Sequence, residues 1–509
     1  MAGPPSPSFI FGNFHALVAD SSLTSQWRRQ FGRNFRFRLL FGRVELHTSD
    51  IKAVARIVTN GSIYNKTPSN LNFARDLLGN GLLSVEGEEH KRQRRIMNPA
   101  FAPMQIRALT EVYVEKAIHL RDVWAHQVAD NPDGVVLDVS GWFRRVTLAV
   151  IGQAGFNYEF NALASEEEKE ESNPLNKAFN DLQHSPQSQL YARFRTVQAV
   201  FPALKILPVP GSQVMSQARA VMRAISGQII STGKAEVVAA DSKEETPFMS
   251  KRDVISLLLK SNLSADVPET HRMSDRDMAA QIPTLLFAGQ ETTSAVISWT
   301  LHVMSLQPRV QTKLRDELLS LDTDNPTTEE LNGLPYLECV VRETLRLYPP
   351  VPYTQRVATQ DDVLPLAEPW MDLRGEVHEN LLVPKGQILH VPIRAVNTDP
   401  EIWGPDALEF VPERWDALPE AISAIPGVYA HLLTFFGGTH NCIGYRFALL
   451  EIKAILYAVV RAFEFTPAIP KERIVPQALG LIHRPAVVGE DKSQISGLPL
   501  VVRAYNHEA

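Results

Sequence analysis

The chain has little cysteine, little net charge and no long apolar run. It holds 2 cysteines in 509 residues and no CxxC pair, which excludes a disulfide framework and argues against a zinc ribbon or thioredoxin-like site. The formal net charge is −6 and the pI is near 6.2, so nothing indicates nucleic-acid binding. Without an 18-residue apolar run or a secretion signal, the chain as written is expected to be soluble and cytoplasmic.

Helical periodicity, in contrast, is abundant. Apolar residues make up 44% of the chain and charged residues 21%, which suffices for a large core. Strand signals are few, with a hairpin predicted over 35–48 and short strands over 383–391. The charge run 165–172 is expected to be a solvated loop or helix end, and the polar segment 234–252 a surface loop. The segments with helical periodicity are 112–128, 192–229 (broken near Pro208 and Pro210), 334–347 and the stretch from Gly444 to about Phe463. The predicted fold class is mainly α with a minor β-sheet.

One predicted helix is much longer than the others. It starts near Ser274, where Ser274 and Asp277 form a capping-box pattern, and ends near Leu306. Its roughly 30 residues exceed the usual 11 or 12, and its nearly apolar middle predicts that it crosses the interior. The polar cluster AGQETT, residues 288–293, lies in that middle and requires a reason to be there.

Cys442 stands between glycines at the predicted start of the last helix. A helix N-terminus lowers the pKa of a thiol, while Gly438 and Gly444 allow sharp turns and close approach of a bulky group. Most lone free cysteines are buried small hydrophobes. The glycines and the helix start favour a functional thiolate here, but they do not distinguish a nucleophile from an iron ligand.

The segment FFGGTHNCIG around Cys442 resembles the haem-binding signature of the cytochrome P450 family. The matching positions are Phe435, Gly438, His440, Cys442 and Gly444. One motif is a hypothesis, but three further segments resemble family motifs in the expected order. The resemblance runs from GPPSPS near the N-terminus to about Arg503. It implies a single P450 catalytic domain over 1–509, with a Pro-rich hinge over 1–12 and a long central helix crossing the haem.

AGQETT resembles the family's oxygen-activation motif. Gly289 weakens the helix, and a threonine hydroxyl can bond a carbonyl one turn back and bend it. The resemblance implies that Thr292 hydrogen-bonds dioxygen at the iron and that Glu291 helps to relay protons. Without the resemblance, these residues form a threonine-rich core patch with Glu291 at the helix surface.

ETLR and PERW resemble the family's ExxR pair and its arginine partner. Glu343 and Arg346 are i,i+3 neighbours and share a helix face. The resemblance implies a network of Glu343, Arg346 and Arg414 that holds the haem-binding core and performs no chemistry. Loss of one member would strand the others, although an isolated i,i+3 pair is most often an ordinary surface salt bridge.

The segment 87–101 resembles the family helix whose Trp and Arg contact the haem propionates. His90 stands at the Trp position and Arg94 at the Arg position, and Arg356 resembles a further propionate-binding arginine. His440 replaces the commoner Arg two residues before the thiolate. Because neither histidine is a guaranteed cation at neutral pH, propionate binding is expected to be weaker or pH-dependent.

The basic residues of this segment, Lys91, Arg92, Arg94 and Arg95, have two interpretations. They can form a solvated basic face, or they can border the surface on which the family's electron donor docks. The candidate docking residues are Lys91, Arg92, Arg446 and Lys453.

The chain resembles eukaryotic microsomal members of the family, fungal-looking ones in particular. This resemblance implies a haem-thiolate monooxygenase. It would insert one oxygen atom from O2 into a terpenoid, fatty acid or aromatic, as in secondary metabolism. Haem b is the implied cofactor, and NADPH–cytochrome P450 reductase and cytochrome b5 are the implied partners of a monomer. Eukaryotic members of the family usually carry a membrane anchor just before such a hinge. A form of this protein with that anchor is expected on the cytosolic face of the endoplasmic reticulum membrane. The positions expected to line the substrate pocket are 72–83, Leu285, Leu286, Ala288, Val351 with 352–354, Leu481 and Ile482.

Two alternatives differ in class. A haem-thiolate isomerase or dehydratase rearranges an oxygenated lipid without a reductase, but such members usually lack the acid–alcohol pair that Glu291 and Thr292 provide. A gas sensor or ligand carrier would bind haem without catalysis, but no output domain accompanies the motifs. A requirement for NADPH and reductase distinguishes the first alternative, and the Soret band of the reduced CO complex tests thiolate ligation.

Overall fold

The structure is a computed structural model of the chain. It describes residues 1–19, 23–164, 174–183, 185–200, 204, 206–241, 253–264, 268, 271–479, 482–488 and 495–505. The charged run over 165–172, expected to be a solvated loop or helix end, lies outside the described residues.

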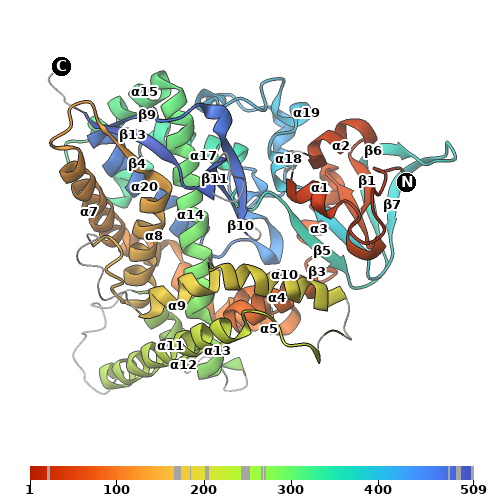
Figure 1. The fold of residues 1–509 in the computed structure, drawn as a ribbon, viewed down its shortest axis with the longest axis horizontal. Helices are drawn as coiled ribbons and strands as arrows, with labels where there is room; N and C mark the ends of the chain where they lie inside the picture. Colours follow the sequence, from red (N-terminus) through yellow and green to blue (C-terminus); the bar gives the residue numbers. More distant parts are fainter. Residues whose placement is uncertain are drawn as a thin grey trace.

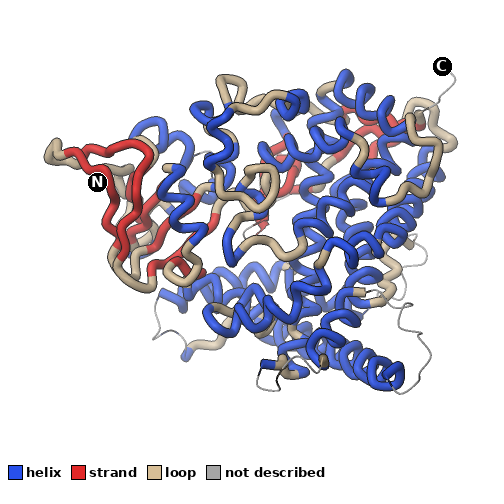
Figure 2. The backbone as a smooth tube through the Cα atoms, turned by 180° about the vertical axis from the view of Figure 1, so that it is seen from behind, coloured by secondary structure: helices blue, strands red, loops and turns tan. Residues whose placement is uncertain are grey.

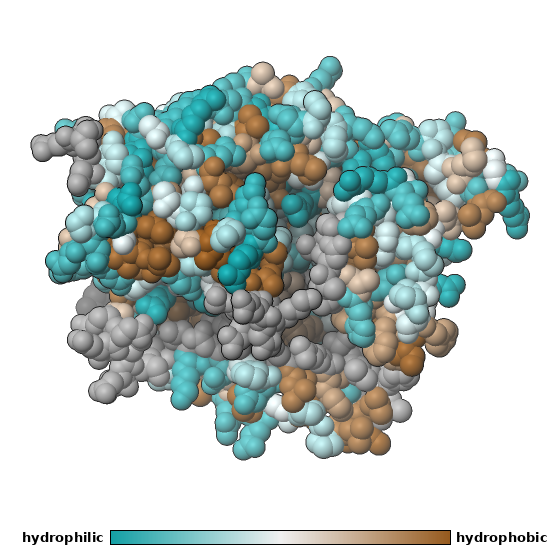
Figure 3. Space-filling model, turned by 45° about the horizontal axis from the view of Figure 1, so that its top comes forward, coloured by the Kyte–Doolittle hydropathy of each residue, from teal (hydrophilic) through white to brown (hydrophobic). Residues whose placement is uncertain are grey.

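Helices form most of the molecule and two groups of strands flank them (Figures 1 and 2). The strands near the N-terminus gather at one end, and β4, β9 and β13 lie together on the side of the C-terminus (Figure 1). The predicted class, mainly α with a minor β-sheet, is confirmed. Hydrophilic residues cover most of the face in Figure 3, broken by smaller hydrophobic patches, and no described helix is long and apolar enough to cross a bilayer.

The strands that the structure describes form four small sheets. One sheet has the order β1-β2-β8-β5-β3, in which β2 and β8 are parallel and the other pairs antiparallel. Its strands are β1 (Asn34–Arg38), β2 (Val44–Thr48), β3 (Tyr64–Lys66), β5 (Thr354–Ala358) and β8 (Ile388–Val391). The others are the hairpin β6 (Asp362–Met371) and β7 (Val377–Val383), the sheet of β4 (Val135–Asp138), β13 (Pro499–Ala504) and β9 (Phe463–Pro467), and that of β10 (Ile474–Leu479), β11 (Ile482–Val488) and β12 (Ile495–Ser496).

The predicted hairpin over 35–48 is present as β1 and β2, with Phe35 opposite His47. The alternation has a clear physical basis, because Phe35 and Phe37 are buried against Trp27 while Arg36 and Arg38 are exposed. The strand signals over 383–391 correspond to the end of β7 and to β8.

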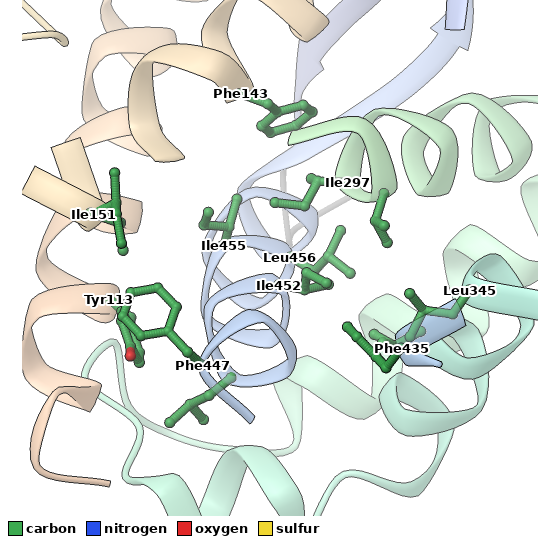
Figure 4. Close-up of a cluster of buried hydrophobic side chains, with 14 of the residues drawn as sticks. Tyr113, Phe143, Ile151, Ile297, Leu345, Phe435, Phe447, Ile452, Ile455 and Leu456 are labelled. Carbon is green, nitrogen blue, oxygen red and sulfur yellow. The ribbon is translucent and has the colours of Figure 1, made fainter. Parts of the chain in front are cut away.

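The helices surround a core centred on α14. Those before it are α1 (Phe14–Ala19), α2 (Leu23–Phe31), α3 (Ile51–Thr59), α4 (Pro68–Leu78), α5 (Gly87–Met97), α6 (Pro103–Ala108), α7 (Thr110–Val128), α8 (Val139–Phe156), α9 (Pro174–Gln183), α10 (Pro186–Val200), α11 (Ser212–Asp241), α12 (Val254–Leu263) and α13 (Asp275–Ala279). From there on they are α14 (Gln281–Leu306), α15 (Pro308–Leu319), α16 (Thr328–Asn332), α17 (Pro335–Leu347), α18 (Ile393–Asn397), α19 (Pro400–Trp403) and α20 (Tyr445–Ala462). Figure 4 shows apolar side chains of α7, α8, α14 and α20 that pack between these helices, among them Tyr113, Phe143, Ile297 and Ile455.

The long central helix is interrupted near its start. Ser274 caps α13 by accepting the Asp277 N–H, as the capping pattern predicted. The helix then breaks at Ala280 and resumes as α14. Pro283 explains the interruption, because it has no N–H for the carbonyl four residues earlier and its ring crowds that carbonyl. The prediction of one unbroken helix from Ser274 is therefore wrong in this detail.

The remaining helix predictions are confirmed, and one loop prediction is wrong in part. The helices expected over 112–128, over 334–347 and after Gly444 are present as α7, α17 and α20, and Pro208 and Pro210 separate α10 from α11. The loop predicted over 234–252 is wrong for 234–241, because these residues continue α11. They include three alanines, which favour a helix. The remaining 242–252 lie outside the described residues.

Candidate functional site

The loop that carries Cys442 is fixed by backbone contacts. The Cys442 N–H donates to the Phe435 carbonyl at 2.9 Å, and Gly444 precedes the first turn of α20. Gly438 has φ +61°, and a Cβ there would lie 2.2 Å from the Val58 carbonyl oxygen. Packing of the loop on α3 and the left-handed backbone therefore both require glycine at position 438. A Cβ on Gly444 would make only an ordinary 3.7 Å contact with Phe101.

Cys442 is exposed at a pocket of about 340 Å³ that Arg94, Asn441 and Tyr445 also line. Crowding by protein atoms raises the pKa of its thiol, whereas the Gly444 N–H and the Arg94 guanidinium act in the opposite direction. The loop therefore presents an accessible sulfur with a cation and a helix start beside it, which suits a thiolate ligand.

Two histidines lie face to face beside the Cys442 loop. The rings of His90 and His440 stack with centroids 4.7 Å apart. Burial, followed by the charges of Lys66 and His440, lowers the pKa of His90 to about 4, so His90 is neutral at pH 7 and can offer only a neutral N–H. The expectation that His90 is not a guaranteed cation agrees with this environment.

A carboxylate that the sequence did not point to lies against these histidines. The Glu86 side chain is 11% exposed and its Oε2 is 2.7 Å from His440 Nε2. Its Oε1 accepts the Lys66 N–H at 2.9 Å and is 3.5 Å from Lys66 Nζ. Burial opposes ionisation, but the hydrogen bond from His440 and the charge of Lys66 prevail and lower the pKa of Glu86 to about 2. Burial lowers the pKa of Lys66 to about 8.

Arg94 and Arg356 complete this cluster of cations. Arg94 donates to the Asn441 carbonyl at 2.6 Å and to Asn98 Oδ1 at 2.9 Å. Arg356 is 7% exposed, lies 4.6 Å over the Phe436 ring, and donates to Thr354 Oγ1 at 2.6 Å. Burial lowers the pKa of Arg356 to about 10, so it remains a cation. Within the described part of the chain, neither guanidinium has a carboxylate within 4 Å.

These residues fit haem. Arg356 is buried and Arg94 is half-buried, and guanidinium groups removed from water without a carboxylate partner favour an anionic ligand such as a propionate. The exposed sulfur of Cys442 offers the iron ligand. Lys66 joins the predicted set because β3 pairs with β5, which places Lys66 opposite Arg356. No local pattern could have pointed to Lys66, since it is paired with a residue 290 positions away (356 − 66).

The predicted oxygen-activation segment lies in the middle of α14. Thr292 Oγ1 donates to the Ala288 carbonyl at 2.6 Å, the back-bond expected of a threonine one turn on. Most of α14 is buried, but Ala288, Gly289 and Thr292 are half-buried and share one face. A Cβ on Gly289 would lie 3.2 Å from Ile151, so this glycine also allows α8 to pack closely.

Glu291 points to a different neighbour from Thr292. It is 1% exposed, and its Oε2 lies 3.6 Å from Arg484 Nη1 of β11. The alternative of Glu291 at the helix surface is therefore wrong. Arg484 was not predicted, because a contact between residues 193 positions apart (484 − 291) leaves no local pattern.

The family model for Cytochrome P450 matches residues 2–488. The chain belongs to the cytochrome P450 family. Among curated P450 relatives, Cytochrome P450 monooxygenase 205 of Postia placenta is 42% identical over 508 residues, 99% of this chain and 92% of the relative. Cytochrome P450 monooxygenase claP of Ampulloclitocybe clavipes is 34% identical over 517 residues, again 99% and 92%. The chain is accordingly a P450 monooxygenase, and the cofactor of its family is haem.

In this P450 the predicted Glu343 network is fully formed. Glu343 and Arg346 have no exposed side-chain surface and join at 2.7 Å, and Arg414 reaches Glu343 at 3.3 Å. Glu343 also accepts the Trp415 indole N–H at 3.1 Å and the Val411 N–H at 3.0 Å. Arg346 donates to the carbonyls of Asn397, Ala407 and Glu409. The network thus ties α17 to the irregular segment that leads toward the Cys442 loop; its role in holding the P450 haem core stays a prediction.

The predicted substrate-pocket residues of the P450 differ in accessibility. Ala288 and Val351 are half-buried, whereas Leu285 is 6% and Leu286 0% exposed and both pack in the main core. Leu286 therefore acts as a core residue in this structure. Leu481 lies outside the described residues.

The candidate docking cations of the P450 also differ in their exposure to solvent. Lys91 and Arg446 are exposed, and Arg92 is half-buried and bonded to the Arg272 carbonyl at 2.6 Å. Lys453 is 4% exposed and held by Glu338 and Asn332, each at 2.7 Å. The prediction of Lys453 as a docking residue is wrong, because its ammonium is used inside the protein.

Proposed function

We propose that this P450 inserts one oxygen atom from O2 into a lipophilic small molecule, a terpenoid, fatty acid or aromatic. NADPH supplies the electrons through NADPH–cytochrome P450 reductase, with cytochrome b5 as a further partner, and the monomer works in secondary metabolism at the cytosolic face of the endoplasmic reticulum. The observation that carries the proposal is the half-buried face of Ala288, Gly289 and Thr292 in a mostly buried, mostly apolar helix. It supports an apolar reaction space with one hydroxyl in it.

Haem b, when bound, supplies the oxygen-activating iron, and a thiolate ligand favours O–O cleavage. Cys442 provides that sulfur, and Phe435, Gly438 and Gly444 shape its loop. Arg94, Arg356 and Lys66 bind the propionates as cations, while His90 and His440 complete the cradle. In this assignment Lys66 is an addition to the residues that the sequence predicted.

Thr292 and Glu291 handle protons, Thr292 from the half-buried face of α14 and Glu291 from the buried side that faces β11. Thr292 Oγ1 donates its proton to the Ala288 carbonyl at 2.6 Å and would turn that proton toward the half-buried face of α14 when the cofactor is in place. Glu291, buried in a dry helix, can release a proton from its carboxyl and take another from water. Apolar neighbours exclude bulk water, which limits loss of protons and electrons to side reactions.

The isomerase or dehydratase alternative is disfavoured by this acid–alcohol pair. The deciding experiment combines the purified protein with NADPH and a fungal reductase. A ligand screen for the ferric low-to-high spin shift identifies lipophilic candidates, and their oxygenated products are then measured under 18O2. Product that carries one 18O and requires NADPH is expected. Product formed equally well without NADPH would establish the isomerase class instead.

Thiolate ligation has its own test. The reduced CO complex is expected to show the red-shifted Soret band, and Cys442→Ser is expected to lose it while haem content stays measurable. The second cysteine, Cys339, is half-buried and its thiol pKa is raised to about 11 by burial, so Cys339→Ser is the matched control and should keep the band.

A further inference from the structure

Two buried glutamine side chains, Gln93 of α5 and Gln281 at the start of α14, bind each other and have no exposed surface. Gln281 Nε2 donates to Gln93 Oε1 at 3.0 Å and to the Asp277 carbonyl at 2.9 Å. Gln93 Nε2 donates to Glu89 Oε1 at 2.8 Å. This glutamine pair therefore joins α5 to the junction of α13 and α14, where the long helix is interrupted.

The glutamine pair also holds the chain between α4 and α5. Gln281 Oε1 accepts the Leu82 N–H at 3.1 Å, and Gln93 Nε2 donates to the Asn80 carbonyl at 3.0 Å. Both N–H groups of each amide are thus used, and each amide oxygen accepts a hydrogen bond. Turning either amide over would set donor against donor and acceptor against acceptor, so the arrangement is unique. Residues 79–84, which the pair holds, are called the covering segment below.

The covering segment keeps its own shape through other hydrogen bonds. The Ser84 N–H and the Ser84 hydroxyl both donate to the Gly81 carbonyl at 2.9 Å. Arg75 of α4 donates to the Ser84 carbonyl at 3.1 Å, and Lys66 Nζ is 3.5 Å from the Leu82 carbonyl oxygen. Because these bonds fold the segment, the glutamine pair chiefly determines how closely the segment lies against α14.

The covering segment lies on the same face of α14 as Thr292. Thr284, Ala288 and Thr292 follow one another at four-residue intervals and therefore share one side of the helix. A Cβ on Gly81 would lie 2.7 Å from the Ala280 carbonyl oxygen and closer still to the Thr284 hydroxyl, so only glycine allows this approach. The segment therefore ends the half-buried face of α14 one turn before Ala288.

We propose that Gln93 and Gln281 are positioning residues that determine which substrates fit beside Thr292, because they hold the covering segment against the start of α14. The inference rests on the proposed function, which places the substrate at the half-buried face of α14. With the glutamine pair intact, that space is closed at its Thr284 end and favours compact lipophilic molecules. When the pair is broken, the segment moves away from α14 and extended molecules gain room.

Methionine substitutions separate the position of the covering segment from the packing of the core. Methionine is unbranched like glutamine but offers no amide. Gln281→Met strands the Leu82 N–H and the facing Gln93 amide, and Gln93→Met strands the Asn80 carbonyl in the same way, so each variant should lower the melting temperature. The double variant replaces both facing amides, which should recover part of that loss. It restores neither hydrogen bond to the covering segment.

The test uses the holoenzyme, and no substrate need be known. The probes are alkylimidazoles from 1-methylimidazole to 1-octylimidazole, which bind haem iron through a ring nitrogen, so that the Soret shift gives their dissociation constants. Hydrogen–deuterium exchange of the backbone amides of the covering segment is measured in the same variants. The matched control is Gln311→Met, which removes a buried glutamine of α15 whose amide binds the N–H and the carbonyl of Phe465 in β9 at 2.8 and 3.0 Å.

In wild type we expect affinity to fall once the alkyl chain is longer than the closed space allows. In Gln93→Met, Gln281→Met and the double variant, the affinity for octylimidazole relative to methylimidazole should rise about fivefold, the equivalent of one hydrogen bond. Amide exchange in the covering segment should accelerate by about the same factor. Gln311→Met should lower the melting temperature but keep the wild-type affinity ratio and exchange.

Two outcomes would overturn the inference. Variants of the glutamine pair that lower the melting temperature but keep the wild-type affinity ratio and exchange would show that the pair only stabilises the fold. An affinity ratio raised equally in Gln311→Met would show that the effect follows general destabilisation. Where a single variant does not bind haem, the double variant decides by the same ratio. Failure of the proposed function is distinguishable, because the wild type would then bind the imidazoles but form no NADPH-dependent product that carries 18O.

Discussion

The pKa values of individual buried carboxyl groups in this protein are shifted in opposite directions. Glu86 is surrounded by His440 and Lys66 and remains ionised to low pH, with a pKa of about 2. Glu451 of α20 is 1% exposed and has no cation within 4 Å in the regions that the structure describes, so burial raises its pKa well above the ordinary range. We therefore expect Glu86 and Glu451 to change the stability of the folded protein with pH in opposite directions.

Glu86 should stabilise the protein most at neutral pH. Its folded pKa lies below the unfolded value of about 4.3, so its contribution is present above that value and is lost as pH falls toward 2. Glu86→Gln should cost on the order of 2 kcal/mol of unfolding free energy at pH 7. Thermal unfolding at pH 7 and pH 3 measures this, and an equal loss at both pH values would contradict the assignment.

Glu451 should show the reverse trend. Its folded pKa is raised, so the stability linked to its proton is complete below about pH 4.3 and declines as pH rises above it. Glu451→Gln removes this decline and should gain about 1–3 kcal/mol over wild type at pH 8. Thermal unfolding at pH 5 and pH 8 tests it, with the exposed Glu472→Gln as control. No gain at pH 8 would show that Glu451 is ionised without cost.

At the scale of elements, the Glu343 network is the main tie between α17 and the PERW segment. Arg346→Ala leaves Glu343 buried without its principal cation, which should cost about 3–5 kcal/mol. We expect loss of bound haem and of the reduced CO band. Arg342→Ala, which removes the half-buried arginine that pairs with Glu338 on the same helix, is the control. Retained haem and an unchanged melting curve in Arg346→Ala would show that the network is dispensable.

The elements also show how far sequence alone could lead. The Ser274 cap, the helix that follows Cys442, the 35–48 hairpin and the Glu343–Arg346 pair are local in sequence, so their spacing predicted them. Glu86 with His440, Lys66 with Arg356, and Glu291 with Arg484 join residues hundreds of positions apart, and no local period encodes such contacts. The wrong prediction of Lys453 as a docking residue has the same origin. The sequence around this lysine does not show that its ammonium group will pair with Glu338 of another helix.

At the scale of the whole molecule, partner docking should depend on charge. Lys91 is exposed on α5, and Lys91→Glu reverses that charge. We expect the rate of reductase-driven haem reduction to fall several-fold at low ionic strength and to converge with wild type at high salt, since exposed charges are screened. The control is Lys385→Glu, in the turn between β7 and β8. Equal effects of both variants would exclude Lys91 from the docking surface.

The parallel pairing of β2 with β8 has a consequence for how the chain is made. His47 and His390 face each other across this pair, 343 residues apart. At about 5–20 residues per second, the N-terminal hairpin waits roughly 17–70 s for its partner strand to leave the ribosome. During that interval β2 has an open edge, which is a template for pairing with other chains. Chaperone capture of nascent chains should therefore be strongest before residue 390 emerges.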